Sequence, residues 1–92
     1  VNEIQWIDAA GDYMCVHATE QTHIMRRTMK EFEKDLDPNT FVRAHRSVIV
    51  NIKYVQKMVS HISGEYHLIL SNGTELKVSR SHRDRVKEMI KI

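Results

Sequence analysis

The sequence predicts a single α+β domain that is mainly β, built from antiparallel strands and hairpins with a short middle helix and a C-terminal helix. Short runs of alternating or β-branched apolar residues recur along the chain, separated by turn residues. Two longer stretches, 28–37 and 79–92, show helical spacing instead. A chain of 92 residues with 41% apolar side chains suits one hydrophobic core, so we expect residues 1–92 to form one domain.

The first third of the chain predicts a β-meander. Alternating apolar residues around Ile4 and Trp6 predict a strand that ends at 9–12, where a glycine supplies the backbone freedom for a turn. Residues 13–18 are β-prone, and residues 22–25 resume the strand character after a polar turn. These two segments are therefore expected to pair as a hairpin.

The middle helix is predicted from its start signal. Thr28 and Glu31 have the spacing of a capping box, in which each side chain satisfies a free amide of the first turn. Met29, Phe32 and Leu36 then repeat at helical spacing, and the only proline of the chain follows shortly afterwards. We expect about two helical turns whose apolar stripe covers a sheet.

The middle of the chain contains one clear strand and one ambiguous run. Residues 41–44 predict a short strand, whereas the apolar run 47–51 fits either a strand or one helical turn. Periodicity cannot separate the two at this length, so both interpretations stay open. Further on, residues 54–60 and 66–71 predict a hairpin that turns at Ser63 and Gly64.

A second hairpin and the C-terminal helix complete the domain. Asn72-Gly73 predicts a two-residue type I′ turn, because such a turn needs positive φ at both central positions. Beyond the following strand, Ser79 and Ser81 are both placed to cap a helix, and Asp84 lies three residues after Ser81. Val86 and Met89 then repeat at helical spacing, which predicts an amphipathic helix to the end of the chain.

Charge is distributed unevenly along the chain, although the net charge is only +2. Residues 1–40 contain four basic and eight acidic side chains, whereas residues 41–92 contain ten basic and four acidic ones. This polarity fits a face that binds a polyanion, but a merely solvated basic side would have the same composition.

The sequence also indicates a compartment. It contains no run of about 20 apolar residues and no secretory signal at its start, so we expect no membrane span and no export. Cys15 is the single cysteine and lies in an apolar stretch, which indicates a reduced thiol and a cytoplasmic protein. Because the chain does not begin with methionine, we expect it to be a domain excised from a longer protein.

Two short segments, 43–47 and 78–83, combine arginines with serines where the chain changes structure. An arginine fork can bind a phosphate or the O6 and N7 atoms of guanine, and a nearby hydroxyl can bind a phosphate oxygen. The alternative for the second segment is that Ser81 only caps the helix and the arginines are solvated. Arg80 and Arg83 would then oppose the positive end of the helix dipole, which favours an anionic partner.

Metal and catalytic sites find no support in the spacing of reactive side chains. Cys15 and His17 lie on the same face of their strand, but packing or exposure explains this placement better than a two-ligand metal site does. Asp8 and Asp12 are better explained as solvated turn carboxylates than as an acid/base pair. No glycine-rich loop precedes a helix. We therefore predict no enzyme and no cofactor. We also predict no metal, because the histidines form no i, i+4 pair on a helix and no Cys-x-x-Cys accompanies them. The six histidines are His17, His23, His45, His61, His67 and His82.

The order of the motifs resembles that of the LytTR DNA-binding domain family. The most specific of them are Phe-x-Arg-x-His-Arg-Ser-x-x-Val-Asn, Leu-x-Asn-Gly and Val-Ser-Arg. The chain is identified as a member of this family on segments that together cover nearly its entire length: 7–13, 27–32, 41–51, 70–73 and 78–81.

This resemblance implies an elongated, mainly β fold in which loops at strand ends, and no recognition helix, enter successive major grooves on one side of DNA. Carried over by position, base contacts fall on Arg46, Arg80 and Tyr13. The role of Tyr13 stays open, because the neighbouring Asp12 would repel phosphates. The alternative is that Tyr13 belongs to the core. We assign phosphate contacts to five further residues: His45, Ser47, Lys57, Ser81 and Arg83.

The resemblance further implies sequence-specific binding of double-stranded DNA by the output domain of a bacterial two-component response regulator. Its expected partners are promoter direct repeats and an N-terminal receiver or other regulatory domain, and a homodimer on DNA stays open. A protein-interaction or ligand-sensing β-module with an open strand edge is the leading alternative from another class. RNA binding is a lesser alternative, because stacking aromatic residues are few.

Overall fold

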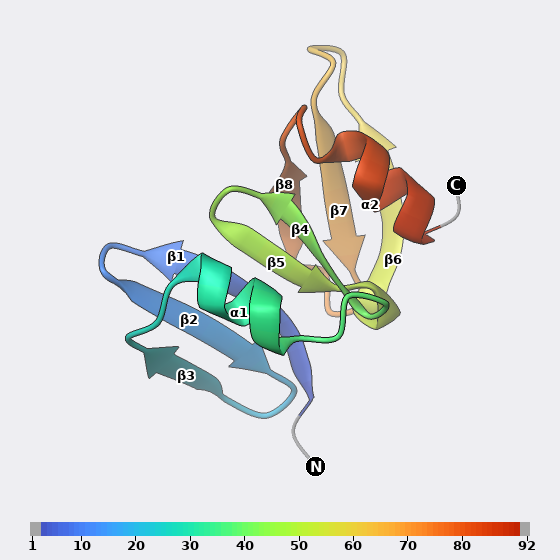
Figure 1. Ribbon diagram of the computed structural model, residues 1–92. Coiled ribbons are helices and arrows are strands. Elements are labelled where there is room, and N and C mark those ends of the chain that lie inside the picture. Colours follow the sequence, from blue (N-terminus) through green and yellow to red (C-terminus); the bar gives the residue numbers. More distant parts are fainter. Residues whose placement is uncertain (1–2, 91–92) are drawn as a thin grey trace.

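The computed structural model describes residues 3–90 and contains two antiparallel sheets and two α-helices (Figure 1). The larger sheet has the strand order β3-β2-β1-β5-β4, with β1 at Ile4–Ala10, β2 at Tyr13–Ala18, β3 at Thr22–Met25, β4 at Phe41–His45 and β5 at Val48–Asn51. The smaller sheet has the order β6-β7-β8, with β6 at Val55–Ser60, β7 at Tyr66–Leu70 and β8 at Glu75–Val78. The helices are α1 (Met29–Asp35), the short 3-10 helix η1 (Ile52–Tyr54) and α2 (Arg83–Ile90). The predicted mainly β, α+β fold class is confirmed.

Strands β1 to β3 form the predicted meander, in which β2 pairs with both neighbours. Gly11 turns the chain between β1 and β2 with a φ of 63°, in the left-handed region that glycine adopts without strain. Strand β3 lies at one edge of the larger sheet. All four of its residues are exposed, and Ile24 has 69% of its surface accessible.

Helix α1 begins at the predicted capping box. Thr28 Oγ1 accepts a hydrogen bond from the Glu31 N–H at 3.1 Å, and the Glu31 carboxylate accepts one from the Thr28 N–H at 2.8 Å. The hydrogen bond from this backbone amide lowers the pKa of Glu31. One turn further, Phe32 is buried and packs with Ile7 and Met14 of the sheet, as the apolar stripe of the helix predicts.

The undecided apolar run forms strand β5, in the interior of the larger sheet between β1 and β4. Ile49 joins the core under α1, whereas Val50 joins the core under the smaller sheet. A strand that is buried on both faces needs a continuous apolar run, which is why no alternation identified it. Asn51 ends the strand: its Nδ2 donates to the Ile4 carbonyl at 2.9 Å, and its Oδ1 accepts from the Lys53 N–H at 3.0 Å.

The β7–β8 hairpin forms as predicted, but its turn differs. The Gly73 N–H donates to the Leu70 carbonyl at 2.9 Å, so Ser71 and Asn72 are the central residues of the turn. Gly73 follows with a φ of 91°, and the Leu70 N–H donates to the Thr74 carbonyl at 2.8 Å. The predicted two-residue type I′ turn is therefore wrong: the loop has three residues, and the last of them is a glycine in the left-handed region.

Helix α2 starts at Arg83, and the His82 carbonyl accepts its first hydrogen bond, from the Val86 N–H at 3.1 Å. His82 is therefore the N-cap residue, and the prediction that Ser81 caps this helix is wrong. The Ser81 hydroxyl instead lies 3.3 Å from His82 Nδ1. Val86 is fully buried and anchors α2 in the core that the two sheets share.

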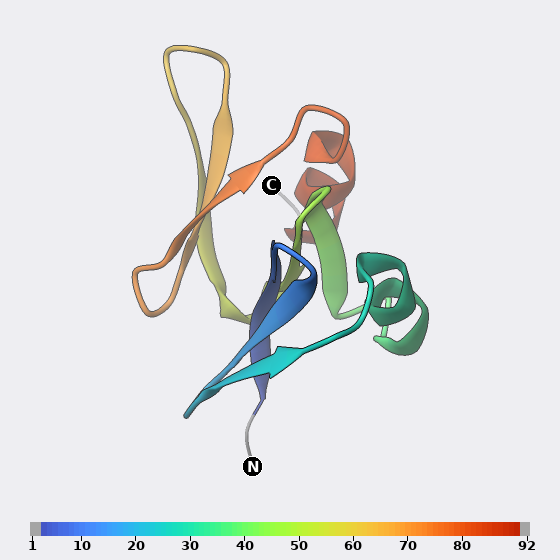
Figure 2. The ribbon, with the colours of Figure 1, turned by 90° about the vertical axis from the view of Figure 1, so that its left-hand side faces the viewer.

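Two apolar cores meet at β5. The core under α1 contains Ile7, Met14, Val16, Phe32 and Ile49. The core between β4–β5, the smaller sheet and α2 contains Val42, Ala44, Val50, Leu68, Leu70, Leu76, Val78 and Val86. Figure 2 shows the smaller sheet and strands β1 to β3 at opposite ends of the molecule, which measures 35 × 25 × 22 Å.

Candidate nucleic-acid interface

Strands β1, β4 and β8 all end on the same side of the molecule, and each is followed there by a chain reversal (Figure 1). Two backbone hydrogen bonds connect these reversals. The Ala9 N–H donates to the Ser47 carbonyl at 2.9 Å, and the Ser79 N–H donates to the Ala44 carbonyl at 2.8 Å. We call residues 11–13, 45–47 and 79–83 the turn face. The two arginine-serine segments that the sequence singles out are therefore neighbours in space.

The two central arginines of the turn face are free. Arg46, in the β4–β5 turn, and Arg80, in the loop between β8 and α2, are both exposed. Within residues 3–90 neither guanidinium group makes a hydrogen bond, an ion pair or a contact with an aromatic ring. Each fork therefore keeps all its donors available for a ligand.

The β4–β5 turn is held by Arg43, which lies in a segment that the sequence singles out but received no assigned contact. Arg43 Nε donates to the His45 carbonyl at 3.1 Å, and its Nη2 donates to the Arg46 carbonyl. The Nη1 of the same guanidinium pairs with the Glu33 carboxylate of α1. One planar group thus fixes the backbone from which Arg46 projects. No local pattern in the sequence distinguishes Arg43, because Glu33 belongs to a different element.

His45 contacts Ser47 through one ring nitrogen. Its Nδ1 lies 3.0 Å from the Ser47 hydroxyl and accepts from the Ser47 N–H at 3.3 Å. The pKa of His45 is lowered, first because burial penalises the charged ring and then because basic groups surround it: Arg46, Lys77, His82 and Arg43. The surroundings of His45 therefore concentrate positive charge that an anion would relieve.

The β8–α2 loop is organised around His82. Ser79 Oγ lies 2.6 Å from His82 Nδ1, and the Ser81 hydroxyl remains exposed beside it. The Arg83 guanidinium stands over the Tyr66 ring at 5.3 Å. Between this loop and the β6–β7 turn, with His45 also in its lining, lies a hollow of about 260 Å³ whose charged lining residues are Glu65, Lys77, Arg80 and Arg83. The excess of positive charge there suits an anionic ligand.

Tyr13 lies at the surface next to the β1–β2 turn, with 47% of its area exposed, so its alternative placement in the core is wrong. The Arg26 guanidinium stands 5.9 Å from the centre of its ring. Arg26 also shares a shallow surface pocket with Asp12. This arginine partly offsets the acidic charge that argued against a DNA contact at this turn, and sequence reasoning missed it because it belongs to the segment after β3.

Lys57 is the predicted contact that the structure does not bring together with the others. It is exposed on β6, where it pairs with Ile69 of β7. Strand β6 is the edge of the smaller sheet opposite β8, so two strands separate Lys57 from the loop that carries Arg80. The other predicted residues all lie on the turn face.

Fold and site together define a class of protein: a β-rich domain that presents basic chain reversals on one side. Residues 1–91 match the model of the LytTr DNA-binding domain family, and the chain belongs to this family. It superposes on the solved LytTr DNA-binding domain of a response regulator from Bacillus cereus with a TM-score of 0.88 and 26% identity, covering 97% of this chain and 82% of that one.

Curated relatives are named as a transcriptional regulatory protein and as sensory transduction proteins. The chain is 32% identical over 75 residues to the transcriptional regulatory protein LytR of Staphylococcus aureus strain N315. These residues are 82% of this chain and 30% of that protein. It is 29% identical over 90 residues to the sensory transduction protein LytT of Bacillus subtilis strain 168, covering 98% of this chain and 37% of that protein. The chain thus spans about a third of the length of these relatives. No helix between residues 3 and 90 is long and apolar enough to cross a membrane.

Proposed function

We propose that the chain binds double-stranded DNA sequence-specifically, as the output domain of a bacterial two-component response regulator that acts in the cytoplasm, and that turn-face arginines read the major groove. The observation that carries the proposal is the pair of exposed, unpartnered guanidinium groups of Arg46 and Arg80 on turns joined by the Ser79–Ala44 hydrogen bond. An arginine fork directed at guanine O6 and N7 is a common specific contact in DNA recognition.

Each predicted residue takes a role in this proposal. Arg46 and Arg80 contact bases, and Tyr13 contacts a base from the β1–β2 turn. Four turn-face residues bind phosphates and set the register of the domain on the duplex: His45, Ser47, Ser81 and Arg83. Lys57 lies apart on β6 and serves only a flanking phosphate.

The length of the relatives supports a wider arrangement. Because the chain covers 30 to 37% of LytR and LytT, these proteins contain a further segment long enough for a regulatory domain. We propose an N-terminal receiver domain in the full-length protein, direct-repeat promoter sites and a homodimer on DNA. Nothing in the proposal requires a cofactor or a membrane.

Arginine substitutions test base reading. A bound site is first selected from a random duplex pool, and affinities are then measured for that site and for a random duplex. Arg46→Ala and Arg80→Ala should each cost about 1 to 3 kcal/mol on the selected site and relax preference at one base pair. Arg83→Ala should weaken binding to all sequences alike and reduce the salt slope by about one.

Lys34→Ala is the matched control, because Lys34 is an exposed cation in the last turn of α1. It should leave both affinities nearly unchanged. Equal losses on random DNA for Arg46→Ala, Arg80→Ala and Arg83→Ala would reject base reading.

A second candidate function rests on the edge strand β3. Its backbone edge is open within the described residues, and Ile24 and Met25 are exposed at 69% and 38%. This combination suits a protein partner that adds a strand. Titration with duplex DNA and with single-stranded RNA at two salt concentrations separates the functions, because only a DNA-binding domain gains duplex affinity steeply as salt falls.

A further inference from the structure

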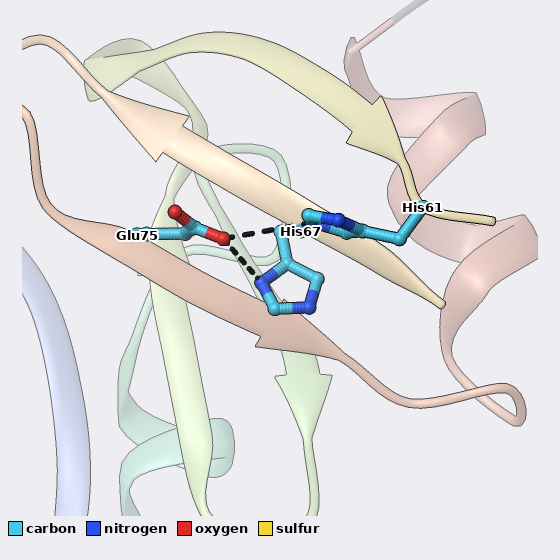
Figure 3. A group of neighbouring side chains, drawn as sticks. All are labelled: His61, His67 and Glu75. Atoms are coloured by element: carbon cyan, nitrogen blue, oxygen red, sulfur yellow. Dashed lines mark ion pairs between the residues drawn. The ribbon is translucent and has the colours of Figure 1, made fainter. Parts of the chain in front are cut away.

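The outer face of the smaller sheet gathers two imidazoles and a carboxylate from three successive segments. His61 follows directly after β6, His67 lies in β7 and Glu75 lies in β8 (Figure 3). The strand register pairs Ile69 with Glu75 and His67 with Lys77, so Glu75 and His67 are diagonal neighbours on the same face. None of the three belongs to the turn face.

Their donor atoms converge on one point. His67 Nδ1 lies 2.6 Å from Glu75 Oε2, and His61 Nε2 lies 3.7 Å from the same oxygen. One donor atom from each residue lies within 4.8 Å of the others. The imidazole rings of His61 and His67 meet edge to face, with centroids 4.3 Å apart, so both nitrogens reach the carboxylate from one side.

We propose that His61 Nε2, His67 Nδ1 and the Glu75 carboxylate bind a divalent transition metal ion of the zinc class. Two imidazoles with one carboxylate form a donor set that Zn²⁺ accepts, at about 2.0 to 2.2 Å from each ligand, with a fourth position open to water. The side chains are partly exposed, at 46% for His61, 20% for His67 and 48% for Glu75. They can therefore separate by the fraction of an ångström that an ion between them requires.

A second carboxylate supports the assignment. The other ring nitrogen of His67, Nε2, lies 3.5 Å from Glu65 Oε1, and Glu65 Oε2 lies 3.4 Å from Lys77 Nζ. Glu65 therefore lies beside the imidazole nitrogen of His67 that is not directed at the proposed ion, where it can orient the ring. Metal-binding histidines commonly have such a partner.

The spacing rules applied to the sequence could not detect this site. They test histidines four residues apart on a helix and Cys-x-x-Cys pairs, whereas these ligands come from two hairpins. Without a metal, the same residues would form only histidine–carboxylate ion pairs on an exposed face, which contribute little. A metal site would bind an ion with a defined stoichiometry, whereas a set of ion pairs would not.

Metal titration of the chain, free of any affinity tag and in the absence of DNA, tests the proposal. Co²⁺ is added while its d–d absorption is followed, and Zn²⁺ is then added as a competitor. The expected result is one ion per chain, displaced by Zn²⁺, with an upward shift of the melting temperature. The imidazole NMR signals of His61 and His67 should move on Zn²⁺ addition, whereas those of His23, exposed on β3, should not.

Ligand variants complete the test. His61→Ala, His67→Gln and Glu75→Gln should each weaken metal affinity at least about tenfold, and His23→Ala should leave it unchanged. The NMR measurement on the unmodified chain needs no variant, so it remains decisive if a substitution unfolds the sheet. Binding with no defined stoichiometry, or shifts spread over all histidines alike, would overturn the proposal. Because no DNA is present, neither result bears on the proposed DNA-binding function.

Discussion

Arg43 contributes to the turn face through the backbone that it holds. Its guanidinium bonds the carbonyls of His45 and Arg46 while pairing with Glu33. An ammonium group cannot match this planar fork, although it carries the same charge. Arg43 is therefore a positioning residue for Arg46 in the proposed complex.

Arg43→Lys should lower DNA affinity about 3- to 10-fold without changing the salt slope, because the charge is kept while the turn loses its support. The free energy of unfolding should fall by about 1 to 3 kcal/mol, the range for hydrogen bonds to charged groups. Fluorescence anisotropy and urea unfolding measure the two effects. Arg85→Lys, whose ion pair is with Glu88 on the surface of α2, is the control. Unchanged affinity in Arg43→Lys would contradict the positioning role.

His45 predicts a pH dependence of binding. Because its pKa in the folded chain is depressed, folding disfavours the protonated ring. Its contribution to stability is therefore complete above the ordinary histidine value of about 6.5 and declines as the pH falls below that value. A DNA phosphate near the ring would favour the proton again, so binding should take one up.

The affinity for DNA should consequently rise as the pH falls from about 7.5 to about 6, by at most about tenfold per pH unit for one proton. His45→Gln should reduce this dependence, whereas His23→Gln should preserve it. Affinities measured across this range at constant ionic strength provide the comparison. An identical pH profile for His45→Gln and the original chain would remove His45 from the proposed phosphate contacts.

Among the elements, helix α1 depends most visibly on a local signal. Seven residues are too few for a stable isolated helix, so its start must be fixed by the capping box and its middle by the burial of Phe32. The same hydrogen bonds that satisfy the first amides keep the Glu31 carboxylate ionised, as its lowered pKa indicates.

Thr28→Ala should lower the free energy of unfolding by about 1 kcal/mol, because it removes the acceptor for the Glu31 N–H. Thr28→Ser keeps the hydroxyl and should remain close to the original chain. Urea unfolding followed by circular dichroism measures both. Equal destabilisation by alanine and serine would mean that the methyl group of Thr28, and not its cap, stabilises the helix.

The turn and cap predictions that proved wrong share a cause. Asn72-Gly73 and Ser81 carry correct local signals for a hairpin and for a nearby helix start. Which residues form the hairpin turn depends on the register of β7 and β8. Which residue caps α2 depends on where the loop between β8 and α2 is hydrogen-bonded to β4. Local chemistry therefore locates such features to within one or two residues.

At the scale of the whole molecule, the uneven distribution of charge along the chain predicts the turn face only in part. The basic excess of residues 41–92 includes Arg46, Arg80 and Arg83 of the turn face, but it also includes Arg43, which is used internally. Arg26, from the acidic first part, lies beside Tyr13 instead. Composition thus predicts that a basic surface exists, and the fold decides which cations remain free to form it.

Alternation, the capping box and the glycine turns could be interpreted from the residues alone, because each depends on side chains only a few positions apart. They were sufficient for every strand except β5, for both α-helices and for the two segments that contain Arg46 and Arg80. The meeting of the two arginine turns, the separation of Lys57, the support by Arg43 and the convergence of His61, His67 and Glu75 were not predictable in this way. Each results from strand order and register, which are set by burying apolar faces against segments that are distant in the chain.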